Sequence, residues 1–267
     1  MKIESDVLRT ELALLGPGAR IEDRGDHLFV EVPDQPSFFF GNLLVFERGP
    51  APGDAARWPA LFGEAFAHRP GVRHVTLAWQ QAAPDDRGRD ALVAAGFEHH
   101  SHVGMIAREV RVRETRIAKL AIREIVSDQD WEHAAQHELR LNPRPEHFKD
   151  YAAFVAGRFR ALRRLAQEGR GAWYGAFAEE QLVSALGLFR VGELARYQNV
   201  GTHPEFRRLG IAGALIAEAA RRTLSRPGVE RLVMVSEDSG GAFDLYRALG
   251  FEPAERRFAL CRASGAA

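Results

Sequence analysis

Residues 197–224 read YQNVGTHPEFRRLGIAGALIAEAARRTL, and they contain the clearest pattern in the chain. The first part favours a β-strand, because aromatic and β-branched residues are common in strands, and Pro204 ends it since proline cannot donate to a sheet. From Ile211 onward, apolar residues recur every three or four positions, which predicts an amphipathic helix. The stretch therefore predicts a strand, a turn and a helix in direct succession.

The turn before this helix has the composition of an anion site. Two arginines come first, and three small residues follow at close spacing. Small residues let the backbone approach a ligand, and the first N–H groups of a helix have no partner within the helix. Because these donors lie at the positive end of the helix dipole, the turn predicts a diphosphate site. The residues of this predicted site are Arg207, Arg208, Leu209, Gly210, Ile211, Ala212 and Gly213.

Two common nucleotide-binding motifs do not fit this turn. A Walker loop needs GxxxxGK[ST], which is absent from the sequence. A dinucleotide fingerprint needs GxGxxG directly after a buried strand, and Gly210-Ile211-Ala212-Gly213 does not have that spacing. What remains is Arg207-x-x-Gly210-x-Ala212, with an ordinary helix start beside two arginines as the alternative.

A second motif lies downstream, at Leu245-Tyr246-Arg247-Ala248-Leu249-Gly250-Phe251. A short apolar run at 231–236 precedes it and predicts a strand buried on both faces. Residues 242–249 then predict a two-turn helix, with Gly250 as its left-handed cap. Taken alone, Tyr246 is most simply interpreted as a core aromatic residue with its hydroxyl at the surface.

Together the two motifs resemble those of the GCN5-related N-acetyltransferases (GNAT). Arg207-x-x-Gly210-x-Ala212 matches the family signature [QR]-x-x-G-x-[GA], and residues 245–251 match its LYxxxGF run. In that family the loop holds the pyrophosphate of acetyl-CoA, and the tyrosine hydroxyl lies near the thioester sulfur, where it can protonate the departing thiolate. The resemblance implies acetyl-CoA as co-substrate and Tyr246 as a catalytic residue.

The resemblance also implies contacts along the rest of the cofactor. The strand before the loop is expected to diverge from its neighbour, so that the backbone of Val200, Gly201 and Thr202 can bond to the pantetheine. The amide of Val200 is expected to face the thioester carbonyl oxygen, as a donor in an oxyanion hole. The family usually has an asparagine seven residues before the tyrosine, where this chain has Ser239. Serine can still give one hydrogen bond, so a weakened contact is expected.

Direct acetyl transfer to an amine also needs a base, because an ammonium group must lose a proton before it attacks. Glu237 and Glu193 are candidates, and Gln198 or Asn199 could position a water molecule; the sequence singles out none of them. The acceptor, a small-molecule amine or a peptide, and the oligomeric state are not specified either. A non-catalytic acyl-CoA-binding or regulatory module stays open as a second function, and Ser239 leaves room for it.

Three histidines raise the question of a metal site. His133 and His137 lie four residues apart on one predicted helix, and His147 lies near the start of the next, which is predicted from about residue 146 to residue 167. No HExxH pattern or further close ligand set accompanies them, so no metal is expected. Solvated histidines are expected instead, with a substrate contact for His147, because in the resembled fold these two helices wall the acceptor pocket.

The composition restricts the class of protein. The 267 residues carry 36 Lys and Arg and 36 Asp and Glu, and this zero formal charge argues against neutralisation of nucleic-acid phosphates. A single cysteine, Cys261, excludes a disulfide framework. No apolar run approaches the roughly twenty residues that span a bilayer, and residues 1–12 lack the apolar segment of a signal peptide. A soluble cytoplasmic protein without nucleic-acid or membrane partners is expected.

The order strand, helix, strand, helix, Gly-Phe occurs twice, at 37–97 and at 195–251. Aligning the two Gly-Phe pairs puts Leu92 where Tyr246 lies, and the first copy lacks an Arg-x-x-Gly-x-Ala loop. The repeat predicts two related copies of the fold, of which the first has lost its cofactor chemistry. Chance similarity between two such units is the alternative.

The predicted fold class is α/β (α+β), with a mixed, mostly antiparallel central sheet flanked by helices as in the GNAT fold. The charge-dense stretch 108–116 is the candidate boundary, interpreted as an exposed edge strand plus linker. Residues 1–115 are expected to form a degenerate GNAT-like domain without the cofactor motif. Residues 116–267 are expected to form the N-acetyltransferase domain.

Overall fold

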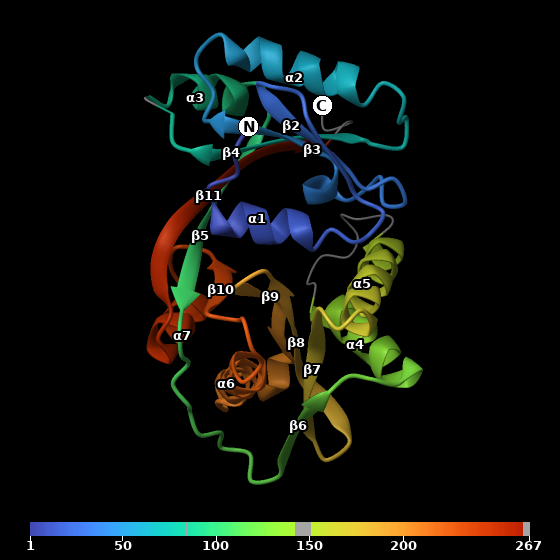
Figure 1. Ribbon diagram of the computed structural model, residues 1–267, viewed down its shortest axis with the longest axis vertical. Coiled ribbons are helices and arrows are strands. Elements are labelled where there is room, and N and C mark those ends of the chain that lie inside the picture. Colours follow the sequence, from blue (N-terminus) through green and yellow to red (C-terminus); the bar gives the residue numbers. More distant parts are fainter. Residues whose placement is uncertain (84, 142–150, 264–267) are drawn as a thin grey trace. The chain divides into compact units, whose positions relative to one another are not determined.

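The computed structural model describes residues 1–83, 85–141 and 151–263. The chain divides into two compact units, Met1–Val103 with Glu255–Ala267 (unit 1) and Gly104–Ala254 (unit 2). The division falls within two strands, β5 (Glu98–Ala107) and β11 (Glu252–Ala263) (Figure 1).

The compact units are bounded differently from the predicted domains, 1–115 and 116–267. Most of β11 lies in unit 1, because it pairs antiparallel with β4 (His74–Gln81), from Phe258 opposite Trp79 to Ala263 opposite His74. The local pattern of the sequence did not predict this strand. Its partner lies far away in the sequence, so neighbouring residues carry no sign of the pairing.

Unit 1 has a mixed sheet with helices on both faces. Its strands follow the order β1 (Arg20–Asp23), β2 (His27–Glu31), β3 (Leu43–Arg48), β4 and β11. Only β3 and β4 pair in parallel among the registers of these strands. Leu28 and Val45 pack with the leucines of α1 (Asp6–Ala13), whereas Phe29 and Leu44 pack with α2 (Asp54–Ala65) and α3 (Arg87–Ala94) on the opposite face (Figure 1). The alternation follows from the two-residue period of a strand.

The strand expected at the start of the first repeat, from residue 37, begins only at Leu43. A 3-10 turn, η1 (Phe39–Gly41), precedes it, and the side chain of Asn42 holds this turn in place. Asn42 Oδ1 accepts from the Val32 amide at 3.1 Å, and Asn42 Nδ2 donates to the Phe38 carbonyl at 3.0 Å. These side-chain bonds compete with extension of the strand, which is why the apolar run alone was misleading.

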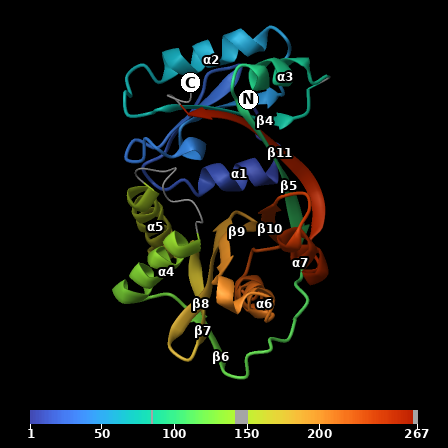
Figure 2. The same cartoon turned by 180° about the vertical axis from the view of Figure 1, so that it is seen from behind.

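The strands of unit 2 also pair in mixed directions. Its strands follow the order β10 (Arg231–Ser236), β9 (Leu194–Thr202), β8 (Gln181–Val191), β7 (Gly171–Ala178) and β6 (Leu120–Glu124). β9 and β10 are parallel and the other neighbours are antiparallel. Helix α6 (Ile211–Leu224) covers one face, and α4 (Asp128–Leu141) and α5 (Tyr151–Gln167) cover the other, as Figures 1 and 2 both show. This confirms the predicted mixed, mostly antiparallel sheet flanked by helices.

The helices of unit 2 largely begin and end where the sequence predicts. Ser127 Oγ accepts from the Asp130 amide at 3.1 Å and so caps the start of α4. Arg123 holds the pKa of the Asp130 carboxyl well below its usual range, chiefly through a side-chain hydrogen bond. The helix predicted from residue 146 is described from Tyr151 onward, and its first residues lie outside the described part.

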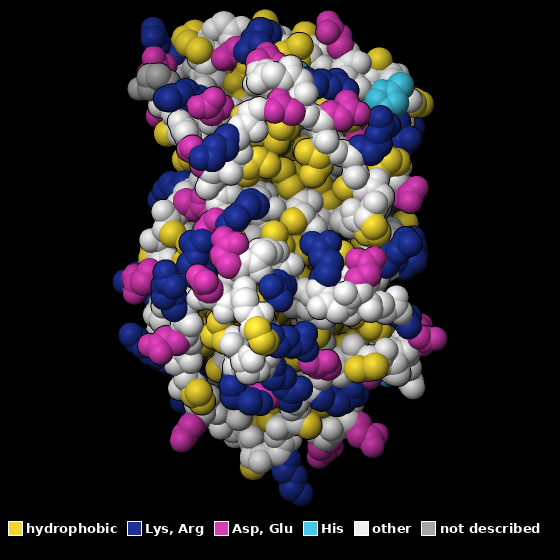
Figure 3. All heavy atoms as spheres, viewed as in Figure 1, with side chains coloured by type: hydrophobic (Ala, Val, Ile, Leu, Met, Phe, Trp, Pro, Cys, Tyr) yellow, Lys and Arg dark blue, Asp and Glu magenta, His cyan; other side chains and the backbone are white. Residues whose placement is uncertain are grey.

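Charged side chains of both signs cover the surface. On the face shown in Figure 3, Lys and Arg are interspersed with Asp and Glu. Several of them form ion pairs, such as Arg123 with Asp130 and Arg221 with Glu218. None of the helices described here is both long enough and apolar enough to cross a membrane.

Candidate functional site

Strands β9 and β10 diverge halfway along their length. Their parallel register covers three pairs, which end at Arg196 opposite Val233. β9 nevertheless continues to Thr202 and β10 to Ser236. The second half of β9 therefore lacks a partner on this side, which is the divergence that the family resemblance implies.

On its other side, β9 contains a bulge. Gly187 of β8 lies opposite Gln198 and Ala185 lies opposite Gly201, so one residue of β8 faces two of β9. The two residues of β9 that face Leu186 are Asn199, in the left-handed region at φ 45°, and Val200. A bulge bends a strand and redirects its side chains, and this one lies at the residue expected to face the thioester.

The chain then turns sharply into α6. A 3-10 turn, η3 (Pro204–Phe206), follows β9, and the guanidinium Nε of Arg207 donates to the Thr202 carbonyl at 3.1 Å. Arg208 and Gly210 both adopt positive φ, 62° and 81°. A Cβ at Gly210 would lie 2.6 Å from the carbonyl oxygen of Glu114, so the position needs glycine for space as well as for conformation.

The amides at the start of α6 have no hydrogen-bond partner among the described residues. Within residues 1–83, 85–141 and 151–263, no hydrogen-bond acceptor is found for the N–H groups of residues 208–213. Gly210 has no side chain to cap the helix, and the first turn of α6 contains no acidic residue. The predicted residues of the loop are thus brought together with their donors unpaired and the helix dipole unopposed. These residues fit a diphosphate.

Tyr246 lies on α7 (Gly241–Leu249), the helix that adjoins this turn. A Cβ added at Gly213 would lie 3.7 Å from the side chains of both Leu245 and Leu249, so α7 packs directly against the first turn of α6. The Tyr246 side chain is 7% exposed, and burial raises its pKa to about 12. Its hydroxyl forms no hydrogen bond with a described residue, and the phenol stays protonated at neutral pH.

Three residues are expected to contact the pantetheine through their backbone, and the carbonyl groups of two of them already accept hydrogen bonds. The Gly201 carbonyl accepts from Ser184 Oγ at 2.8 Å and from His137 Nε2 at 3.3 Å. The Thr202 carbonyl accepts from Arg207. Val200, in the bulge, has no partner in the register with β8. Among the three, Val200 is therefore the residue best suited to contact a ligand through its backbone.

Glu193 and Glu237, the two candidate bases named from the sequence, lie in different parts of unit 2. Glu193 precedes β9 at the end opposite Val200, about 20 Å away at the usual rise of a strand, and it pairs with Arg231 at 3.5 Å. Glu193 therefore lies far from Val200. Glu237 and Ser239 are exposed in the turn that follows β10, on the approach to α7.

No motif in the sequence points to Glu138, which lies on α4 beside the bulge. The Asn199 side chain hydrogen-bonds to its carboxylate, and burial raises the pKa of Glu138. The neighbouring Leu141 fills the space where a Cβ at Gly201 would lie. Only the bulge brings Asn199 to α4, and no local pattern predicts that proximity.

The prediction of solvated histidines is wrong for His137. Its side chain is buried against β9, where Nε2 donates to the Gly201 carbonyl, and burial lowers its pKa. His133 is exposed, as expected, and His147 lies outside the described residues. Among the residues that the structure describes, no group of three or more His, Cys, Asp or Glu could hold a metal ion.

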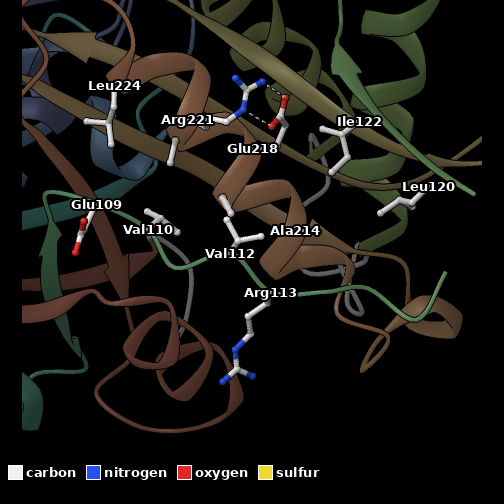
Figure 4. A pocket seen from close by; sticks show the side chains of 12 residues that line it. Glu109, Val110, Val112, Arg113, Leu120, Ile122, Ala214, Glu218, Arg221 and Leu224 are labelled. Atoms are coloured by element: carbon white, nitrogen blue, oxygen red, sulfur yellow. Dashed lines mark hydrogen bonds and ion pairs between the residues drawn. The ribbon is translucent and has the colours of Figure 1, made fainter. Parts of the chain in front are cut away.

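Residues 108–119 form a linker that crosses α6, with neither helix nor strand. The Arg111 amide donates to Leu249 and the Arg116 amide donates to Leu209, both at 2.9 Å. Between the linker and α6 lies a mostly apolar groove of about 440 Å³ (Figure 4), which begins at Ala214, beyond the unpaired amides. Arg113 points away from this groove.

Comparison with known proteins identifies the domain that contains this site. Residues 129–251 match the acetyltransferase (GNAT) family. No curated protein matches the sequence. Solved structures share the fold: a functionally unknown conserved protein of Staphylococcus epidermidis has a TM-score of 0.74 at 13% identity, with 93% of this chain and 95% of that chain covered.

Two further structures are similar over nearly the whole chain. A GCN5-related N-acetyltransferase from Kribbella flavida has a TM-score of 0.68 at 15% identity, with 99% of this chain and 97% of that chain covered. A tandem GNAT protein from the clavulanic acid biosynthesis pathway, solved without AcCoA, has a TM-score of 0.54 at 15% identity with the same coverage. Residues 129–251 of this chain therefore form an acyltransferase domain of the acetyltransferase (GNAT) family.

Proposed function

We propose that the protein is an acetyl-CoA-dependent N-acetyltransferase that acetylates a primary amine, on a small molecule or a peptide, by direct attack. Acetyl-CoA supplies the acetyl group as an activated thioester. The unpaired amides of residues 208–213, at a helix start without acidic residues, are the observation that carries the proposal. The cytoplasmic location expected from the sequence stays a prediction.

The path of the cofactor follows from the divergence of the strands. The pyrophosphate would bind to the first turn of α6, with Arg207 and Arg208 adding charge-assisted contacts. The pantetheine would then extend between β9 and β10, where their ladder ends. The amide of Val200, beside the bulge, would donate to the thioester oxygen, whose negative charge grows in the transition state.

Tyr246 would supply the proton that the departing thiolate needs. Its buried phenol is protonated at neutral pH, and its hydroxyl is not engaged by a described residue. It lies on α7, which packs against the first turn of α6, where the pyrophosphate would bind. This arrangement supports a role as the general acid.

Binding of CoA to an Ala212→Glu variant tests the phosphate site. A glutamate in the first turn of a helix favours the helix dipole, so the fold should be retained. The same charge would repel a diphosphate, and we expect the Kd for CoA, measured by isothermal titration calorimetry, to rise at least about 100-fold. Ala56→Glu, in the exposed first turn of α2, is the matched control and should leave the Kd unchanged. Unchanged CoA affinity in Ala212→Glu would refute the site.

A second experiment distinguishes an enzyme from a module that binds acyl-CoA without turnover. This alternative stays open because the exposed Ser239 stands where the family usually has an asparagine. Release of CoA thiol from acetyl-CoA, in the presence of a polyamine, an arylalkylamine, an amino acid and a peptide with a free amino terminus, separates the two. An amine-dependent release supports the enzyme. Tight binding of CoA without any such release supports the module.

A further inference from the structure

We infer that Glu138 is the base that takes the proton from the acceptor ammonium. This inference rests on the proposed function, and it names a residue that neither sequence motif contains. Three features of unit 2 carry it: the position of Glu138 on α4, its hydrogen bond to the bulge of β9, and the elimination of the other acids.

The position of Glu138 follows from the packing of α4 on β9. His137 donates to the Gly201 carbonyl at 3.3 Å, and Leu141 covers Gly201. Glu138 lies between them in sequence, at the same end of the helix. Its carboxylate accepts a hydrogen bond from the side chain of Asn199, the left-handed residue of the bulge.

This position is on the opposite face of the sheet from the phosphate site. α6 and its first turn cover one face of the sheet, and α4 covers the other (Figures 1 and 2). Val200, the next residue after Asn199, belongs to the same bulge. An acetyl group held at Val200 from the α6 side would thus be open to an amine that arrives from the α4 side, beside Glu138.

The other titratable groups near the bulge are poorer candidates. His137 already donates through Nε2 to a carbonyl, and burial lowers its pKa. His203, in the turn after β9, lies 3.9 Å from Glu205. Arg140 on α4 is cationic and cannot accept a proton. Glu193 is at the far end of β9, and Glu237 is on the turn after β10.

The environment of Glu138 suits a base. Burial is the larger influence on its pKa and raises it, and the Asn199 hydrogen bond acts in the opposite direction. A carboxylate with a raised pKa is a stronger base than an exposed one, so it takes a proton more readily. A partly buried carboxylate would also attract a cationic amine rather than a neutral alcohol.

The proton balance of the reaction is complete with this assignment. Glu138 takes one proton from R–NH₃⁺, and the free amine attacks the thioester carbonyl to form the C–N bond. The C–S bond then breaks, and Tyr246 gives its proton to the sulfur while it recovers one from the nitrogen. The products are the N-acetyl amine and CoA thiol, and Glu138 releases its proton to solvent.

The test compares Glu138→Gln with the unchanged protein in two assays, CoA binding by calorimetry and CoA thiol release over pH 6–10. The release is measured with the most active amine of the panel and, without amine, as slow hydrolysis of acetyl-CoA, in which the same base would activate water. We expect an unchanged Kd for CoA and a turnover at pH 7 reduced about 100-fold or more. With an amine, the defect should shrink as the pH rises towards the pKa of the amine, because the free amine then needs no base.

Two control variants sharpen the result. Glu132→Gln removes an exposed carboxylate of the same helix and should change neither quantity. Asn199→Ala removes the hydrogen bond that stabilises the charged form of Glu138, so the acidic limb of the pH–rate profile should move to higher pH.

Several outcomes would overturn the assignment. Turnover of Glu138→Gln within about threefold of the unchanged protein would show that the carboxylate is not the base. Loss of CoA binding in that variant would show a structural role instead. If the wild-type protein bound acetyl-CoA but neither acetylated an amine nor hydrolysed acetyl-CoA, the base assignment would be contradicted. If it did not bind CoA at all, the proposed function itself would be contradicted.

Discussion

Two strand–helix–strand segments of this chain have the same connections and differ in how their strands end. In β3–α2–β4, the parallel register runs from Leu44 opposite Leu77 to Arg48 opposite Gln81, and the Gly49 amide still donates to Gln81 at 2.9 Å. In β9–α6–β10, the register stops after three pairs. A ligand can bond to strand backbone only where the ladder is open, so only the second segment offers that opportunity.

The two helices that follow these strands also begin differently. The first turn of α2 contains Asp54, whose carboxylate accepts from the Ala51 amide at 2.9 Å, so acid already occupies the positive end of that helix. The first turn of α6 contains no acid, and its amides are unpaired. The same supersecondary arrangement is thus compatible with a helix start that carries an acid and with one that carries none.

The helix before each Gly-Phe pair shows how packing can persist when chemistry differs. The Phe97 amide donates to Leu92 at 3.1 Å, and the Phe251 amide donates to Tyr246 at 3.0 Å, around glycines of positive φ. Leu92 is fully buried where Tyr246 carries a hydroxyl. Leu92 belongs to a core cluster of unit 1 that also contains Phe46 and Trp58, whose stacked rings have centroids 3.7 Å apart. A common origin of the two segments stays a prediction.

The largest contrast should come from one glutamate placed at the start of each helix. Gly210→Glu adds bulk and negative charge beside the unpaired amides, at a position of positive φ, and we expect the Kd for CoA to rise about 1000-fold or more, about 4 kcal/mol. Gly53→Glu points into open space at the start of α2 and should leave CoA binding unchanged. Calorimetry measures both. Retained affinity in Gly210→Glu would contradict the phosphate assignment.

Leu92 and Tyr246 occupy aligned positions in their helices, and replacing them should change different properties of the protein. Leu92→Ala removes a fully buried side chain and should lower the free energy of unfolding by about 3 kcal/mol, measured in urea, with the affinity of folded protein for CoA unchanged. An equal loss of CoA affinity would show that unit 1 contributes to the cofactor site.

Tyr246→Phe should instead affect turnover. Loss of the hydroxyl removes the proton donor and should slow amine-dependent thiol release about 100-fold, while the Kd for CoA stays the same. The ring is kept, so thermal unfolding should change little. Undiminished turnover in this variant would refute the role of Tyr246 as the acid.

The smallest expected effect concerns the buried histidine of unit 1. His74 is 2% exposed, stacks on Phe39 and bonds to the Asn42 carbonyl, and burial lowers its pKa to about 4. The unfolded chain therefore binds a proton between about pH 6.5 and pH 4 that the folded chain does not bind, so stability falls as the pH falls through this window. From pH 7 to pH 5 the loss should be about 2 kcal/mol, and His74→Phe should flatten it in urea titrations. A slope that persists in the variant would assign the proton to another group.

Local chemistry explains which parts were predictable from the sequence. Pro204, Gly210 and Gly250 each determine a backbone conformation within a few residues, so the end of β9, the turn and the cap of α7 were correctly predicted. The early end of the pairing between β9 and β10 was expected only from the resemblance to a family. No residue in either strand indicates where their hydrogen-bonded pairing ends.

Other features depend on residues that are distant in sequence. β11 forms because β4 offers it an edge, and Glu138 meets Asn199 only because a bulge turns that side chain towards α4. The helical pattern alone places His137 at the surface, but in the structure β9 covers its side chain. Such contacts are set by tertiary packing, which a periodic pattern does not encode.

Amide chemical shifts of ¹⁵N-labelled protein, recorded during a titration with CoA, test the central claim most directly. If the start of α6 binds the diphosphate, the amides of Gly210, Ile211, Ala212 and Gly213 should show the largest shifts, while those at the start of α2 should not move. Saturation by CoA with no shift at residues 210–213 would contradict the account.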